Sequence, residues 1–199
     1  MTDGPATARQ PGKPVRADAQ RSIDALLTAA AEVFASAGVD APVRQITARA
    51  GVGAGTLYRH FPQRSDLIAA VFRHEVDACA EDAAALAAQY GPAEALTRWL
   101  YRFVGFIATK HGLSAALHSG NPAYESLPGY FNRRFVPVLG ALLDAAAKDG
   151  EIRSGVDPAD LLRAIANLTM PAREDGGHTQ RMIALLIDGL RYGARPVTP

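Results

Sequence analysis

The sequence contains a single cysteine, Cys79, among its 199 residues. One thiol excludes an internal disulfide framework and any multi-cysteine zinc site. A lone cysteine surrounded by alanines is typical of a small core residue, with a redox sensor as the alternative. No stretch approaches the ~20 apolar residues needed to cross a bilayer, and the N-terminus lacks the apolar core of a signal peptide. We therefore expect a cytoplasmic protein without a membrane partner.

Bulk charge and catalytic motifs are missing as well. The formal net charge is +1, so binding to a nucleic acid or an anionic membrane would require a local patch of positive charge. We find no Ser-His-Asp order, no paired-carboxylate motif and no metal cluster, and we expect neither an enzyme nor a cofactor. His111 and His118 flank Gly112 without a carboxylate at i±3 or i±4 spacing, which disfavours a metal site.

The sequence also lacks alternating strand patterns and internal repeats, which predicts an all-α protein with about nine helices. Residues 1–20 contain three prolines and two glycines and almost nothing to bury, so we expect a disordered tail there. Its basic residues either enter a minor groove or remain disordered. We expect a helix-turn-helix domain over 21–66 and a second helical domain over 67–199.

Apolar residues at helical spacing, together with glycine and proline stops, place the expected helices. Gly38 ends the first, Pro42 opens the second, and Ser65 and Asp66 form a plausible N-cap pair for the fourth. Residues 111–130 are expected to be irregular because glycine and proline interrupt them. The remaining expected helices cover 93–110, 131–148, 158–168 and 179–193.

The stretch "RAGVGAGTLYRHF", residues 49–61, admits two interpretations. A phosphate-binding glycine loop follows a buried strand and opens a crossover helix, but here a short amphipathic helix precedes the glycines. The alternative is a helix-turn-helix, in which Gly51 supplies the left-handed end of one helix. Val52 would fill the wedge between the helices, and Gly53 would stand at the next N-cap. The pattern favours the helix-turn-helix.

Charge in this region points the same way. Between Val43 and Ser65 the chain has four arginines and one histidine and no acidic residue. Positive charge concentrated on one segment is the local footprint of phosphate contact. The alternative is a solvated basic helix pair that never meets DNA.

The run "AAAEVFASAGVDAPVRQITARAGVGAGTLYRHFPQRSDLIAAV" resembles the N-terminal domain of TetR-type (tetracycline-repressor-like) transcriptional regulators. The resemblance covers roughly residues 22–72, and the rest of the chain matches only in helical layout. Two positions depart from the common pattern. Val43 replaces a frequent threonine and Gly53 a frequent serine, so two hydroxyls that could bond phosphate or cap a helix are absent.

The resemblance and the helix-turn-helix geometry together make residues 54–60 the recognition helix. Its N-terminal end is expected to approach bases or phosphates, and Arg64 to clamp a phosphate. Tyr58 packing against the first helix, His60 capping its own helix and a solvent-facing Arg59 are the alternatives. The residues expected to contact DNA are Arg44, Gly55, Thr56, Tyr58, Arg59, His60 and Arg64.

A single helix-turn-helix offers few base contacts, so a two-fold dimer is expected. The last helix is apolar around most of its circumference, which suggests burial on two sides. A central helix of a monomer is the alternative. The expected dimer residues are Leu161, Ile165, Met182, Leu185, Leu186 and Leu190.

Aromatic residues gather around the segment expected to be irregular. Interior aromatics are usually core, but TetR-type proteins hold a small inducer in such a place, so the resemblance implies an apolar effector site. The expected lining residues are Trp99, Phe103, Phe106, His118, Tyr124, Phe131 and Phe135.

The resemblance therefore implies a ligand-responsive transcriptional regulator, a repressor that binds palindromic operator DNA as a homodimer. A small apolar effector would release it. The alternative is a helical small-molecule binding protein or enzyme whose helix-turn-helix is incidental.

Overall fold

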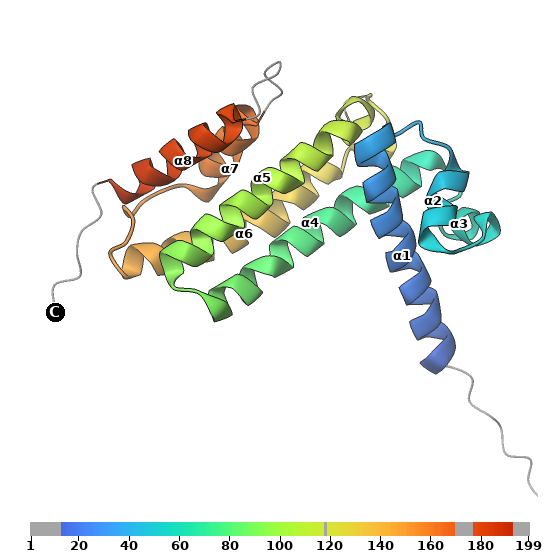
Figure 1. The fold of residues 1–199 in the computed structure, drawn as a ribbon, viewed down its shortest axis with the longest axis horizontal. Coiled ribbons are helices and arrows are strands. Elements are labelled where there is room, and N and C mark those ends of the chain that lie inside the picture. The colour runs from blue at the N-terminus through green and yellow to red at the C-terminus, as the bar shows by residue number, and fades with distance from the viewer. Residues whose placement is uncertain (1–12, 118, 170–176, 193–199) are drawn as a thin grey trace, which may run out of the picture.

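A computed structural model describes residues 13–117, 119–169 and 177–192. These ranges contain eight α-helices, one short 3-10 helix and no strand, which confirms the all-α prediction. In Figure 1, α1 to α3 lie at one end, α4, α5 and α6 run side by side through the middle, and α7 and α8 lie at the other end. The elements are α1 Lys13–Ala37, α2 Val43–Ala50, α3 Ala54–His60, α4 Arg64–Gln89, α5 Pro92–Leu117, η1 Pro122–Tyr124, α6 Leu127–Lys148, α7 Pro158–Leu168 and α8 His178–Arg191.

The first three helices share a small apolar core. Leu26 and Phe34 of α1, Ile46 of α2 and Leu57 of α3 are all almost completely buried. Because α2 and α3 are too short to be stable alone, their packing on α1 holds them in place.

The middle of the molecule is packed by α4, α5 and α6. Trp99 of α5 is fully buried, and its indole Nε1 donates to the carbonyl of Cys79 at 2.9 Å. Burial raises the pKa of the Cys79 thiol to about 12, so this side chain stays a neutral thiol at ordinary pH. The core interpretation of the lone cysteine is therefore the one that the geometry supports.

Helix α1 begins at Lys13, whereas ordered structure was expected from Arg21; residues 1–12 of the predicted tail lie outside the described residues. Residues 18–20 of the added turns are exposed, and local pairs stabilise this part of the helix. Ser22 Oγ donates to the Asp18 carbonyl at 2.9 Å, and the Gln20 amide donates to Asp24 at 2.9 Å. Hydrophobic periodicity does not report such pairs, so the tail was predicted too long.

The segment expected to be irregular over 111–130 is also more regular than predicted. Helix α5 continues through Gly112 to Leu117, and α6 begins at Leu127 instead of Phe131. A single glycine costs a helix only ~1 kcal/mol, which surrounding helix contacts can offset. Pro128 stands near the first position of α6, where its missing N–H leaves no donor unsatisfied.

Helix α4 connects the two predicted domains. Its N-cap is Gln63, not the predicted Ser65–Asp66 pair; a capping box joins the Gln63 side chain to the third-residue backbone, and Asp66 accepts from the Gln63 backbone at 3.0 Å. The boundary predicted between 66 and 67 falls inside this continuous helix.

None of the described helices is long and apolar enough to span a membrane.

Candidate functional site

The turn between α2 and α3 has the geometry expected from its glycines. Gly51 has φ 68°, in the left-handed region, and its N–H points to the carbonyls that end α2. The Val52 N–H donates to the Thr47 carbonyl at 3.1 Å, which completes a Schellman-type helix end. Gly53 then stands at the N-cap of α3 with an extended backbone. This turn fixes the direction in which α3 leaves α2.

Helix α3 buries one side and exposes the other. Leu57 and Phe61 are 2% and 9% exposed and face the core, whereas Tyr58 is 54% exposed. Gly55, Arg59 and His60 are exposed too, and Thr56 is half-buried. The exposed fraction of Tyr58 argues against packing on α1. The predicted contact residues of α3 thus share one outward-facing surface.

Basic groups from α2 flank this surface unequally. Arg44, in the first turn of α2, is exposed, and the structure gives it no acidic partner among the described residues. Arg49, at the other end, forms an ion pair with Glu32 of α1. The segment from Val43 to Ser65 contains no acidic residue, but the fold brings Glu32 of α1 next to it. A charge count along the segment does not include Glu32, because the ion pair joins α2 to α1.

Arg64 has a structural role that sequence reasoning missed. Its guanidinium donates from Nε to the Val39 carbonyl and from Nη2 to the Ala41 carbonyl at 2.5 Å. The same group lies 5.7 Å above the Phe34 ring. Arg64 therefore ties the start of α4 to the loop between α1 and α2, and its role as a phosphate clamp stays a prediction.

A cavity of about 370 Å³ opens between α5, α6 and α7. Its wall is mostly apolar, with Asn132 and Arg163 as polar groups on the α6 and α7 sides. Such a volume falls in the range of small-molecule pockets. The other lining residues are Phe72, Ile107, Leu117, Tyr124, Leu127, Pro128, Phe131, Ala159, Leu162 and Ala166.

Of the predicted effector residues, only Tyr124 and Phe131 line this cavity. Trp99, Phe103 and Phe135 are fully buried in an interlocked ring cluster, with the Phe103 and Phe135 ring centroids 5.2 Å apart. Phe106 packs into the same cluster. Stacked and edge-to-face contacts make these four rings part of the core, and none of them lines the cavity. His118 lies outside the described residues.

Aliphatic residues such as Leu117, Leu127 and Leu162 form much of the cavity wall, and sequence reasoning did not single them out. They carry no sequence signal that distinguishes a cavity wall from an ordinary core position. Only the arrangement of α7 against α5 and α6 turns them into a lining.

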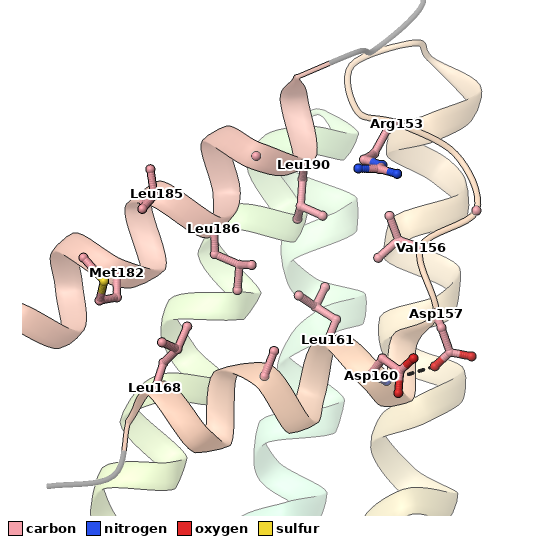
Figure 2. A pocket seen from close by; sticks show the side chains of 13 residues that line it. Arg153, Val156, Asp157, Asp160, Leu161, Leu168, Met182, Leu185, Leu186 and Leu190 are labelled. Carbon is pink, nitrogen blue, oxygen red and sulfur yellow. Dashed lines mark hydrogen bonds between the residues drawn. The ribbon is translucent and has the colours of Figure 1, made fainter.

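An open groove of about 680 Å³ separates α7 from α8 (Figure 2). Leu186 and Leu190 point from α8 toward α7, and Leu185 points away from it. Leu185 is 65% exposed. Met182 and Leu186 are half-buried. This end of the molecule therefore presents an apolar face that none of the described residues covers.

The predicted dimer residues divide into two groups. Leu161 and Leu190 line the groove but are each 5% exposed, and Ile165 is fully buried against the rest of the chain. Ile165 lies one turn after Leu161 on α7, yet it does not line the groove. Met182, Leu185 and Leu186 are the predicted residues that retain accessible surface.

The two ends of the chain match two families. Residues 26–71 match bacterial regulatory proteins of the tetR family. Residues 91–192 match the C-terminal domain described as transcriptional regulator SbtR-like. A comparison with curated protein sequences gives no match.

Solved structures agree with this assignment. TetR transcriptional regulators from Streptomyces coelicolor and Mycobacterium vanbaalenii are each 36% identical to this chain, with TM-scores of 0.74. The matches cover 88% and 89% of this chain and 99% of each of those chains. A gamma-butyrolactone receptor that is 22% identical, with a TM-score of 0.59, shares the fold; the match covers 90% of this chain and 93% of the receptor. These matches confirm the resemblance seen in the sequence: the chain belongs to the TetR family of transcriptional regulators.

Proposed function

We propose that this regulator is a repressor that binds palindromic operator DNA as a homodimer and is released by a small apolar effector. The observation that carries the proposal is the outward face of α3, where Gly55, Tyr58, Arg59 and His60 are all exposed. A short helix with an exposed polar and basic face, following a tight glycine turn, has the form of a major-groove reader.

Within this proposal the contacts divide by position. Gly55 and Thr56 stand at the start of α3, where backbone N–H groups and small side chains can approach the duplex closely. Tyr58, Arg59 and His60 extend the contact along the helix, and Arg44 adds a cation from α2. Arg64 uses two N–H directions on the Val39 and Ala41 carbonyls, and its remaining N–H groups are proposed to meet a phosphate.

The α7–α8 face supplies the proposed dimer contact, and its occupant is a second copy of this chain. Successive major grooves lie ~34 Å apart on one side of a duplex, so two copies of α3 must be joined at a fixed distance. Exposed Leu185 and half-buried Met182 and Leu186 form an accessible apolar strip, and the groove beside them can accept the same strip from the partner. Self-complementary contact of this kind is what two-fold symmetry requires.

The proposed effector site is the cavity between α5, α6 and α7. Its aromatic and aliphatic wall favours an apolar body, and Asn132 and Arg163 offer polar contacts for one end of the molecule. Among the described residues, Arg163 pairs with Asp160 in an exposed 3.5 Å contact, which is weak enough to be exchanged for a ligand group.

Fluorescence anisotropy with duplexes from the region upstream of the protein's own coding sequence, at several salt concentrations, tests the proposal. Replacing the exposed Arg44 with alanine is expected to weaken binding by ~1–3 kcal/mol if it reaches a base, or to lower the salt slope by about 1 if it reaches a phosphate.

Arg133→Ala is the matched control, because Arg133 is an exposed arginine on α6, far along the chain from α3. It is expected to bind DNA like the unsubstituted protein. Absence of any salt-sensitive, sequence-preferring complex would contradict the proposal. A helical small-molecule binding protein would show no difference between the two variants.

A further inference from the structure

The one-turn helix η1 lies where the effector half meets the DNA-reading half. Gly120, with φ 74°, turns the chain out of the α5 direction. The Asn121 side chain then accepts from the Ala123 N–H at 2.9 Å, and Tyr124 N–H donates to the Asn121 carbonyl at 3.0 Å. The turn packs against α4 and buries Tyr124 to 7% exposure. The backbone at Tyr124 is therefore fixed by local hydrogen bonds.

The Tyr124 side chain forms part of two hollows. On one side is the cavity between α5, α6 and α7. On the other is an open groove of about 490 Å³ between the α1–α2 loop and the start of α4, which we call the hinge groove. Among the described residues, Tyr124 is the one that both linings share. The hinge groove is lined by Val39, Asp40, Gln63, Arg64, Ser65, Ile68, Ala116, Asn121 and Tyr124.

Arg64 stands in the hinge groove opposite Tyr124. Through its bonds to the Val39 and Ala41 carbonyls, Arg64 holds the loop that leads directly into α2. Burial raises the pKa of Tyr124, and the positive charge of Arg64 opposes that rise. The two groups therefore interact electrostatically. A displacement of Tyr124 thus changes the surroundings of the group that positions α2 and α3.

The α6 side of the cavity wall is joined to α4 by three hydrogen bonds. The Tyr130 hydroxyl of α6 donates to Asp77 of α4 at 2.6 Å, and Arg134 donates to the same carboxylate at 2.5 Å. Arg73 of α4 adds a 3.2 Å bond to Ser126 at the start of α6. These bonds fix α6 on the middle of α4. Tyr124 differs because it is backed by the open hinge groove.

We infer that Tyr124 is the positioning residue through which occupancy of the cavity reaches the DNA-reading helices. An occupant presses on the Tyr124 ring, the ring moves into the hinge groove, and the Arg64 contacts that hold the α1–α2 loop change. This inference rests on the proposed role of the cavity as the effector site. It goes further by naming one side chain as the connection.

The test fills the cavity without an identified ligand. Ala166 is a half-buried residue of α7 in the cavity wall, so Ala166→Phe places a ring inside. Ala88→Phe, at an exposed position near the end of α4, is the matched control. Each is combined with Tyr124→Phe, which keeps the ring, and with Tyr124→Ala and Tyr124→Leu, which remove it. Two variants without the ring are used so that one unfolded protein does not end the experiment.

Hydrogen–deuterium exchange over residues 39–68 of the full chain, without DNA, is the first measurement. Ala166→Phe is expected to change exchange there several-fold in the unsubstituted and Tyr124→Phe backgrounds and to have no effect without the ring. Rescue by Tyr124→Phe separates positioning from simple loss of stability, which would alter exchange in every combination. An equal response with and without the ring, or no response in any background, overturns the inference.

Affinity for a duplex that the protein itself selects from a random-sequence pool is the second measurement. Ala166→Phe is expected to weaken binding by ~5–150-fold, the usual range of coupling between sites, only where the Tyr124 ring or its Phe equivalent is present. If no duplex is selected, the proposed DNA-binding function fails, whereas the exchange experiment still decides the role of Tyr124.

Discussion

At single positions of α3, the residue that is best for stability can differ from the residue that is best for DNA contact. Gly55 shows this most clearly. It is the second residue of α3, where glycine costs at most the roughly 0.5–1 kcal/mol that it costs relative to alanine inside a helix. A Cβ at this position would meet no atom within 4 Å, so space does not explain the glycine. The absence of a side chain is instead suited to a surface that approaches another molecule closely.

Gly55→Ala is therefore expected to raise the free energy of unfolding by up to about 1 kcal/mol and to weaken operator binding. Urea denaturation and anisotropy titration measure the two effects. Gly105→Ala is the matched control, because Gly105 is an exposed helical glycine of α5 with the same open space around it. That variant should gain similar stability and bind DNA normally. Undiminished DNA affinity of Gly55→Ala would remove Gly55 from the contact surface.

At the level of elements, the turn between α2 and α3 depends on one backbone conformation. Gly51 has φ 68°, and a Cβ there would have no other atom within 4 Å, whereas Gly53 has φ −76°. An L-residue in the left-handed region costs roughly 1–2 kcal/mol, so Gly51→Ala is expected to lower stability by about that much. Circular dichroism during urea denaturation measures it.

Gly53→Ser is the partner experiment in the same turn. The backbone at Gly53 is already extended, and serine is a slightly better N-cap than glycine. The free energy of unfolding should therefore rise by only a few tenths of a kcal/mol. Equal losses in the two variants would mean that crowding, and not the sign of φ, determines the cost.

Much of the element order was predictable from the sequence, because apolar spacing and glycine or proline stops act locally. Leu57 and Phe61 placed the inner face of α3, and Gly51 marked the turn. Features that depend on distant partners were not predictable. The Glu32–Arg49 pair and the Arg64 bonds to the α1–α2 loop each join residues far apart in the chain. The same limit explains the cavity. Trp99, Phe103, Phe106 and Phe135 pack in the core and do not line it, whereas Phe131 of the same cluster does.

At the scale of the whole molecule, DNA binding and self-association must be linked if the proposal holds. A single copy of α3 is a seven-residue helix and offers few contacts, so affinity requires two copies held by one rigid body. Helix α8 lies at the end of the molecule opposite α3, as Figure 1 shows, so the α4–α6 bundle sets the separation of the two reading helices. Loss of the dimer should therefore abolish binding without any change near α3.

Leu185→Glu tests this link, because it places a charge on the most exposed leucine of the apolar strip. Analytical ultracentrifugation is expected to show a monomer with an unchanged circular dichroism spectrum, and operator affinity should fall at least ~100-fold, since avidity contributes roughly 10²–10⁴-fold. Tyr101→Glu, at another exposed large side chain, on α5, should leave both mass and affinity unaltered. A Leu185→Glu protein that stays dimeric would move the interface away from α8. A monomer that still binds with full affinity would show that α3 reads its operator alone.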